Sequence, residues 1–318
     1  MKKRWIFLLT ALMVLSLMAN GFADAKHPGT PGRLIDPVVS TDWLLANGSL
    51  NNLVIIDIRS ANEYLAGHIA NSINMPFELP FCAWLGMKGD ILLELPDDQT
   101  LFNSISSCGI TRDSLVVVVT TLSTPPYPLS NATRVADTLI YAGVKNVAVL
   151  DGGFPKWVAE NKPVTTEIPV ISPVTYRGAV NKEMFVTIDY VKKHLGKSII
   201  IDARDADVYF GITLEDWANK AGHIPTARSL PTPWMWNSDG TYKEIATLRE
   251  MAAGVIEDRN DKFGFDKKEI IIYCGLGGYE SSWWFVLTQM LGYDNVKLYD
   301  GAAQEWVKYY DMSKFRWE

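Results

Sequence analysis

The feature that most restricts the fold of this 318-residue chain is a long pattern that occurs twice. The stretch "LVIIDIRSANEYLAGHIANSINMP" from Leu53 to Pro76 returns as "IIIDARDADVYFG…AGHIPTARSLP" from Ile199 to Pro231. Later, "AGVKNVAVLDGGFPKW" returns as "LGYDNVKLYDGAAQEW", with Gly, Asn-Val, Asp-Gly and Trp in the same places. Solenoid units repeat every 20 to 50 residues, roughly, so this much longer period predicts two duplicated domains.

Each half of the chain contains short runs of apolar residues rich in valine and isoleucine. Amphipathic stretches of helical length lie between these runs, for example 133–141 and 281–290. Continuous apolar strands alternating with helices predict a parallel sheet covered by helices on both faces. We therefore expect an α/β chain of two tandem domains, residues 26–162 and 179–318, joined by a proline-rich linker at 163–178. The expected strands are Val54–Ile56, Val116–Val119, Val147–Leu150, Ile199–Ile201, Ile270–Ile272 and Val296–Leu298.

The first 25 residues have the composition of a secretory signal peptide. Residues 2–4 are basic, an apolar run follows, and the small residues at 23–25 are typical of a cleavage site. The alternative is an uncleaved anchor helix, but Asn20 and Gly21 end the run before the roughly 20 apolar residues that span a membrane. We expect an exported protein, periplasmic or secreted, with no membrane span after the signal is removed.

The overall composition bears on the class of partner. The chain is 48% hydrophobic and 21% charged, which is typical of a globular protein, and its net charge is −6. It contains no block rich in lysine and arginine. An acidic chain without such a block is not expected to bind nucleic acid.

The chain has three cysteines, Cys82, Cys108 and Cys274. In an oxidising compartment, Cys82 and Cys108 either form a disulfide or remain two buried thiols. Cys274 is left over in both cases.

Two histidines, His68 and His223, occupy equivalent places in the repeat, each within a Gly-His-Ile sequence. A functional interpretation makes them bases or metal ligands, whereas a structural one makes them hydrogen-bonded residues of a turn after a helix. No second cluster of metal-ligating residues stands at the spacing of a zinc site. The acidic segment 202–216 also lacks the spacing and the glycine of a calcium loop. We favour the structural role and expect no metal.

Cys274 lies at a place where a thiol becomes reactive. It follows the expected strand 270–272 and precedes an expected helix, in a loop that contains Gly275, Gly277 and Gly278. Such a loop directs backbone N–H groups toward one point, and the helix dipole adds to this anion site. We therefore expect a thiolate with a lowered pKa, and glycines that adopt positive φ so that the backbone curls around the sulfur. The alternative, a buried inert cysteine, leaves three glycines unexplained.

With these motifs the chain resembles a tandem-domain rhodanese, a thiosulfate or 3-mercaptopyruvate sulfurtransferase, over nearly its whole length after the signal. The resemblance implies that Cys274 is the catalytic residue and takes a sulfane sulfur from a small donor as a persulfide. A thiol, cyanide or a partner protein then accepts the sulfur, and no cofactor or metal is implied. It further implies that Gly275, Leu276, Gly277, Gly278 and Tyr279 bind the substrate. The motifs that carry the resemblance are Asp202-Ala203-Arg204, the turn Gly222-His223-Ile224-Pro225, the loop Cys274–Tyr279, and Asp300-Gly301 with Trp306.

The resemblance also implies that the second domain alone is catalytic. When the strands of the two halves are aligned, Thr120 stands opposite Cys274, and Pro125, Pro126 and Pro128 follow it. A hydroxyl is a far poorer sulfur carrier than a thiolate, and prolines remove N–H donors from the loop. We expect the first domain to be non-catalytic and to form one side of the cleft.

The loop departs from the family's pattern in its charges. Thiosulfate-preferring members carry cationic residues just after the cysteine and an arginine where this chain has Val208, and Tyr279 replaces a small hydroxylated residue. Glu280 stands where an alanine is common, and a carboxylate raises the pKa of a nearby thiol and repels an anionic donor. We therefore expect poor use of thiosulfate and a preference for a less charged persulfide or thiol-linked donor. Arg204, the second possible modulator, is expected to be buried against a carboxylate.

Two other functional classes use a similar loop. A cysteine phosphatase needs an arginine six residues after the cysteine, and this chain has Glu280 there. A non-enzymatic periplasmic sulfane-sulfur carrier or binding module uses the same persulfide and passes it to one dedicated partner. The sequence does not separate this carrier from a sulfurtransferase.

Overall fold

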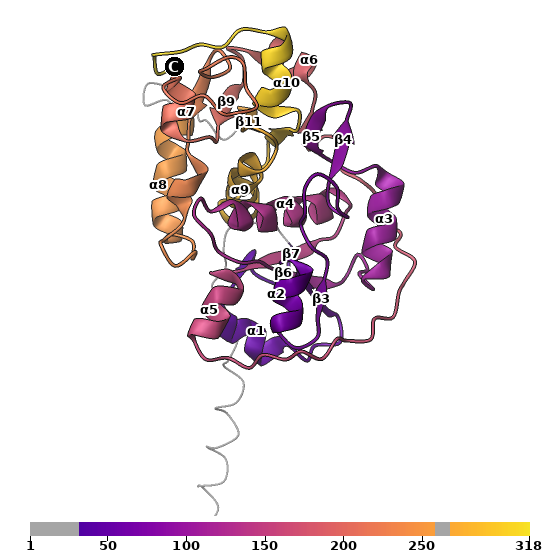
Figure 1. Cartoon of the computed structure of the whole chain (residues 1–318). Helices are drawn as coiled ribbons and strands as arrows, with labels where there is room; N and C mark the ends of the chain where they lie inside the picture. The colour runs from indigo at the N-terminus through magenta and orange to yellow at the C-terminus, as the bar shows by residue number, and fades with distance from the viewer. Residues whose placement is uncertain (1–31, 258–267) are drawn as a thin grey trace, which may run out of the picture.

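Each half of the chain forms a five-stranded parallel sheet in a computed structural model that describes residues 32–257 and 268–318 (Figure 1). The strand orders, β1-β7-β6-β2-β3 and β8-β12-β11-β9-β10, are equivalent, which confirms the duplicated α/β fold. The expected signal peptide, residues 1–25, lies outside the described residues. The strands are β1 (Val38–Val39), β2 (Leu53–Asp57), β3 (Ser72–Asn74), β6 (Leu115–Val119), β7 (Asn146–Leu150), β8 (Phe185–Val186), β9 (Ile199–Asp202), β10 (Ala227–Ser229), β11 (Ile270–Tyr273) and β12 (Val296–Tyr299).

Helices cover both faces of each sheet, as the continuous apolar strands predict. Successive side chains of a strand point to opposite faces, so Val116 and Val118 of β6 join one apolar cluster while Val117 and Val119 join another. The strands β9 and β11 divide their isoleucines between two clusters in the same way. The helices of the first half are α1 (Thr41–Asn47), α2 (Ala61–Ala66), α3 (Asp98–Ser107), α4 (Tyr127–Tyr141) and α5 (Gly153–Ala159). Those of the second half are α6 (Ile188–His194), α7 (Ala206–Phe210), η1 (Thr232–Met235), α8 (Ile245–Ile256), α9 (Tyr279–Phe285), the π-helical turn η3 (Val286–Met290) and α10 (Ala302–Tyr309).

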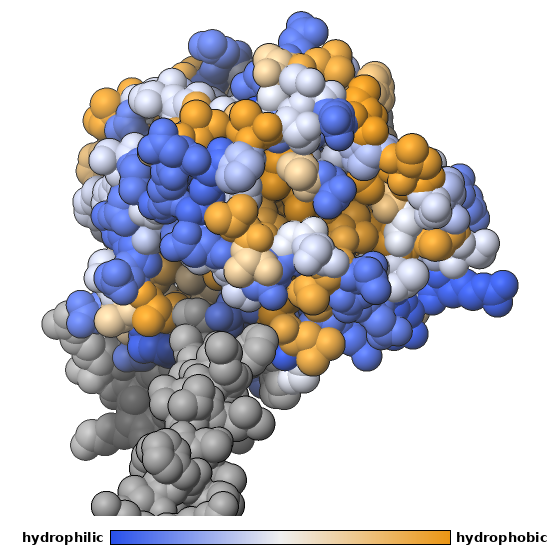
Figure 2. Space-filling view, turned by 90° about the horizontal axis from the view of Figure 1, so that it is seen from below, coloured by the Kyte–Doolittle hydropathy of each residue, from blue (hydrophilic) through white to orange (hydrophobic). Residues whose placement is uncertain are grey.

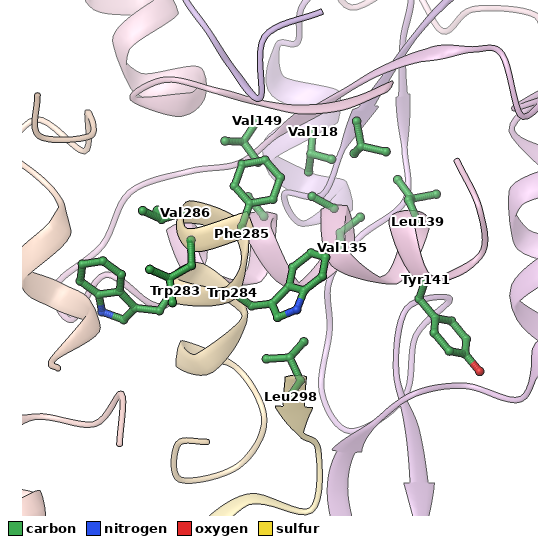
Figure 3. Packing of buried hydrophobic residues seen from close by; sticks show 14 of the residues in the cluster. Val118, Val135, Leu139, Tyr141, Val149, Trp283, Trp284, Phe285, Val286 and Leu298 are labelled. Carbon is green, nitrogen blue, oxygen red and sulfur yellow. The ribbon is translucent and has the colours of Figure 1, made fainter. Parts of the chain in front are cut away.

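The two domains share one apolar cluster, and the helices α4 and α9 lie at its centre (Figure 1). Figure 3 shows Phe285 of α9 beside Val149 of the first sheet and Trp284 above Leu298 of the second. Small hydroxylated side chains let the two helices approach closely, since Thr133 Oγ1 lies 2.9 Å from Ser281 Oγ. The domains therefore form one packed body at this interface.

The domains also exchange short segments in a reciprocal way. The antiparallel hairpin of β4 (Gly86–Lys88) and β5 (Ile91–Glu94) extends from the first domain onto the second (Figure 1). Just after this hairpin, the N–H of Leu95 donates to Asp300 Oδ2 at 2.8 Å. In the opposite direction, the N–H of Tyr242 donates to Asp151 Oδ1 at 2.9 Å. Each Asp-Gly dipeptide of the repeat thus accepts a backbone hydrogen bond from the other domain.

The repeated histidines have the structural role predicted for them. The His68 ring stacks on Tyr64, and its two nitrogens lie 2.9 and 3.0 Å from the carbonyl oxygens of Tyr64 and Glu167. The His223 ring stacks on Tyr209 in the same way, with Nδ1 2.9 Å from that residue's carbonyl.

Cys82 and Cys108 are free thiols in the structure. Burial raises the pKa of both, that of Cys108 to about 11. Of the two alternatives for this pair, the structure therefore has two separate thiols.

The surface of the first domain mixes residue types. Figure 2 shows hydrophilic and hydrophobic residues interspersed over the face at the lower end of Figure 1. Within residues 32–257 and 268–318, no helix combines the length and the apolar character that crossing a membrane requires.

Candidate functional site

Cys274 lies directly after β11, the middle strand of the second sheet, at the edge where the carboxyl ends of the parallel strands meet. Ligands of open α/β sheets bind at this edge. Helix α10 holds the loop from Cys274 to Gly278 by backbone hydrogen bonds. The N–H of Ala303 donates to the Cys274 carbonyl at 2.9 Å, and the N–H of Gln304 donates to the Gly275 carbonyl at 3.0 Å. The Gln304 side chain also donates to the Leu276 carbonyl at 3.1 Å. These bonds fix the backbone that carries the thiol.

The three loop glycines serve different purposes, which corrects the expectation that all adopt positive φ. Gly277 alone among them does so, at φ +111°. Gly275 leaves room for the Glu215 carboxylate, because a Cβ there would lie 2.7 Å from Glu215 Oε1 and would push the end of that side chain aside. Gly278 has φ −101°, and a Cβ there would meet no heavy atom within 4 Å.

Gly277→Ala is therefore expected to lower the free energy of unfolding by about 1–3 kcal/mol, the usual cost of a strained backbone conformation. The new Cβ would also lie 3.2 Å from the Leu93 carbonyl oxygen. Gly278→Ala is the matched control and is expected to stay near wild type. Denaturant unfolding of both variants measures the effect, and equal stabilities would contradict this account of Gly277.

A cavity of about 690 Å³ opens above the loop between the two domains. This confirms that the first domain forms one side of the cleft. Its wall residues from the first domain are Phe77, Leu79, Leu93, Tyr127, Ser130 and Asn131. Of the expected substrate-binding residues, the structure places Gly275, Leu276, Gly278 and Tyr279 in the lining with Cys274, whereas Gly277 lies behind it.

The charges that line the cavity are mainly negative. Asp205, Glu215 and Asp216 are among the lining residues, and Arg204 is the one cation among those that the structure describes there. The Arg204 guanidinium forms ion pairs with two carboxylates. Its Nη2 lies 2.6 Å from Asp202 Oδ2, and its Nη1 lies 3.3 Å from Glu215 Oε2. The expectation that Arg204 is buried against a carboxylate is thus confirmed. Val208, where the thiosulfate-preferring pattern has an arginine, also lines the cavity.

Two tyrosines from different domains face each other at the cavity. The ring of Tyr279 stacks on that of Tyr127 with their centroids 5.5 Å apart. The Tyr279 hydroxyl is buried without a hydrogen-bond partner. This pair adds an aromatic surface beside the thiol.

The Cys274 thiol is buried, with 4% of the residue exposed. Burial first, and then the negative charge of Glu280, raise its pKa well above the usual value. The N–H groups of Gly277, 3.3 Å from Sγ, and of Glu280 lower the pKa but do not outweigh these effects. The prediction of a lowered pKa is therefore wrong, because it counted the loop amides and left out the desolvation of the sulfur.

Glu280, the second residue of α9, is fully buried beside the thiol. Neither of its oxygens makes a regular hydrogen bond, although the carboxyl and the thiol lie near enough to shift each other's pKa. Burial raises the pKa of Glu280 to about 7, while the charge of Arg134 lowers it. A carboxyl that changes charge near neutral pH thus adjoins the sulfur.

Arg134 and Asp137 of α4 complete this buried cluster, and the sequence analysis did not identify them. Arg134 Nη2 lies 2.7 Å from Asp300 Oδ1 and donates to the Leu93 carbonyl at 2.6 Å. Its Nε and Nη1 have no hydrogen-bond partner within the described chain, nor do the oxygens of Asp137. Burial raises the pKa of Asp137 well above its usual value. The guanidinium of Arg134 therefore provides the positive charge for three nearby carboxyl groups, those of Asp137, Glu280 and Asp300.

The equivalent position in the first domain has no thiol. Thr120 follows β6 as Cys274 follows β11, and its hydroxyl donates to the Pro128 carbonyl at 2.8 Å. The hydroxyl is engaged inside its own domain.

In the two described segments, no group of histidine, cysteine, aspartate and glutamate side chains is arranged to hold a metal ion.

Comparisons with known proteins agree with this architecture. A model of the rhodanese-like domain matches residues 40–160 and 187–309. The sulfur carrier protein TtuD of Thermus thermophilus is 29% identical over 287 residues, which cover 85% of this chain and 93% of that protein. A putative thiosulfate sulfurtransferase of Mycobacterium leprae is 28% identical, over 86% of this chain and 94% of that protein. Among solved structures, the 3-mercaptopyruvate sulfotransferase SseA of Escherichia coli matches with a TM-score of 0.70 at 26% identity, over 84% of this chain and 99% of that one.

Proposed function

The chain belongs to the rhodanese-like family, and we propose that it is a sulfurtransferase in which Cys274 carries the transferred sulfur as a persulfide. The observation that supports this most is the position of the thiol. It lies at the end of the middle strand, receives two backbone N–H groups and lines a cavity of about 690 Å³. In the first step Cys274 takes the sulfane sulfur of a donor, and in the second a thiol, cyanide or a partner protein takes the sulfur from the persulfide.

We propose further that the donor is a persulfide or a thiol-linked sulfur compound with little negative charge, rather than thiosulfate. Thiosulfate is a dianion, and the cavity carries three carboxyl groups with its one described cation already paired. The buried Glu280 carboxyl adds a fourth negative charge when it ionises. Repulsion from these groups disfavours an anionic donor.

A sulfane-sulfur carrier with one dedicated partner is the alternative, and the name of the Thermus thermophilus relative favours it. The chemistry at Cys274 is the same in both cases. Repeated turnover with several small acceptors supports the enzyme, whereas delivery to one protein alone supports the carrier.

The proposed function predicts that Cys274 gains the mass of one sulfur atom when the protein is incubated with an organic persulfide that carries no carboxylate, such as 2-hydroxyethyl persulfide. Cyanide should then remove the added mass as thiocyanate. Intact mass with peptide mapping measures this, and Cys108 is an internal control because it is buried and is not among the residues that line the cavity. Gain of sulfur in a Cys274→Ser variant, or no gain in wild type from any donor, would contradict the proposal.

Export of the protein is also proposed, from the composition of residues 1–25. A mature protein that begins after residue 25 in the extracytoplasmic fraction is the expected result.

A further inference from the structure

We propose that Glu280 is the proton carrier of Cys274, accepting the proton of the thiol when sulfur is loaded and returning it to Sγ when sulfur is discharged. This inference rests on the proposed function and adds a catalytic residue to it. It also assigns a chemical role to the helix α4 of the first domain, which has Thr120 at the place of Cys274.

The first support is the geometry of Glu280. The side chain is fully buried, neither oxygen has a hydrogen-bond partner among the described residues, and the carboxyl lies near enough to the sulfur to raise the pKa of the thiol. Burying a carboxyl without partners costs free energy, so such a group calls for an explanation. Glu280 does not line the cavity, which leaves Sγ, rather than the donor, as the atom with which it exchanges a proton.

The second support is the environment of the thiol. Discharge makes the Cys274 sulfur a leaving group, and a thiolate that is buried beside a negative charge is a poor one. Burial raises the pKa of this thiol strongly, so breaking the S–Sγ bond needs a proton at Sγ. The adjoining carboxyl supplies that proton.

Loading and discharge each break one bond to sulfur and form another, and each moves one proton. In loading, the proton moves from Sγ to Glu280, the bond between Sγ and the sulfane sulfur forms, and the donor's remaining group leaves with the electron pair. In discharge, the acceptor bonds to the outer sulfur, the S–Sγ bond breaks, and Sγ keeps the electron pair and regains the proton from Glu280. One proton moves between two atoms, and no oxidant or reductant is consumed.

The groups that face Glu280 explain why it is suited to both directions. These are Cys274 in the loop, Arg134 and Asp137 from α4, and Asp300 before α10. Burial alone would keep Glu280 protonated, and Arg134 offsets this so that the pKa is about 7. An acid or base with a pKa near the working pH is the most effective one. The first domain therefore contributes Arg134, the cation that lowers the pKa of Glu280.

The test measures the two half-reactions separately in Glu280→Gln. Loading from thiosulfate and from 2-hydroxyethyl persulfide is followed by mass, and discharge of the isolated persulfide to a thiol is followed by thiol release between pH 5.5 and 9. We expect discharge at pH 6.5 to be slower in the variant by roughly 10² or more, the usual contribution of a positioned acid. Loading from the organic persulfide should slow as well, because the thiol has lost its proton acceptor, whereas loading from thiosulfate should slow less, because removal of the negative charge favours this dianion. In wild type, discharge should decline above about pH 7 as Glu280 loses its proton, and the variant should lack this decline.

Glu94→Gln is the matched control. Glu94 is another partly buried carboxyl, near Asp300, whose pKa is raised to about 7 chiefly by burial. This variant should keep both half-reactions and the decline above pH 7.

Three outcomes would overturn the proposal. One is that Glu280→Gln discharges sulfur at the wild-type rate, another is that it takes sulfur from the organic persulfide at the wild-type rate, and the third is that Glu94→Gln also loses the decline. Each leaves the proposed function standing. If wild type itself takes sulfur from neither donor, the proposed function has failed instead.

Discussion

Arg134→Leu is expected to lower the free energy of unfolding by about 3–5 kcal/mol, the usual cost of removing one partner of a buried ion pair. The guanidinium is fully buried and pairs with Asp300 at 2.7 Å. It is also the charge that offsets the nearby carboxyl groups of Asp137 and Glu280. Leucine has a similar hydrocarbon body but leaves these three carboxyl groups without a cation.

Denaturant unfolding near pH 7.5 measures this loss, with Arg249→Leu as the control. Arg249 is exposed on α8, and its replacement should change the stability by less than about 0.5 kcal/mol. Arg134→Leu should also recover stability at pH 5 relative to wild type, because the carboxyl groups then take up protons. Equal losses at both pH values would show that packing, rather than charge, explains the effect.

Glu280→Gln is expected to stabilise the protein at alkaline pH by up to about 3 kcal/mol. The pKa of Glu280 rises from its ordinary 4.5 to about 7 on folding. Between these values the unfolded chain releases the proton while the folded chain keeps it, so the stability of wild type falls as the pH rises. Glutamine does not ionise, and this component is absent from the variant.

The ionisation of Glu280 should therefore contribute little to the difference in unfolding free energy between the two proteins at pH 4.5. Its contribution should be largest above pH 7. Unfolding midpoints at pH 5, 6, 7 and 8 give the difference, and Glu250→Gln is a control because Glu250 is exposed on α8. Glu94 titrates in both proteins and cancels in the comparison, whereas the pKa of Asp137 is lower in the variant, because the charge of Glu280 helps to raise it in wild type. A difference that stays constant with pH would show that Glu280 does not ionise in this range.

The sequence was sufficient to predict the fold. Apolar runs alternating with helices identified six strands, and the duplicated Asp-Gly and Gly-His-Ile motifs identified the two domains. These signals are local, because a buried parallel strand is apolar along its whole length wherever it lies in the chain. The short edge strands β1 and β8, of two residues each, carried no such signal and were missed.

The candidate site was predicted only in part. The position of Cys274 after a strand and the unusual Glu280 were visible in the sequence, since both lie in one loop and the helix that follows it. Arg134 was not found, because in the sequence it is one polar residue of an amphipathic helix and its partner Asp300 is distant along the chain. One signal was present, because Arg134 and Asp137 are the two charged residues of α4 and both fall in its buried part.

The direction of the thiol pKa shift was predicted wrongly for a related reason. Loop amides can be anticipated from glycines and a helix start, whereas the burial of Sγ depends on the first domain, which covers the loop with β5 and α4. Desolvation is the larger effect here.

The reciprocal hydrogen bonds to Asp151 and Asp300 have a consequence for how this molecule can be divided or recombined. Each half completes the other, so the thiol-bearing half is not an autonomous module that can be excised or grafted onto another chain. Its own residues provide the sulfur site. The residues that cover the loop, and Arg134, which pairs with the buried carboxyl of Asp300, come from the first domain. The first domain, which has Thr120 where the second has Cys274, thus supplies part of the wall and the charge compensation of its neighbour's site.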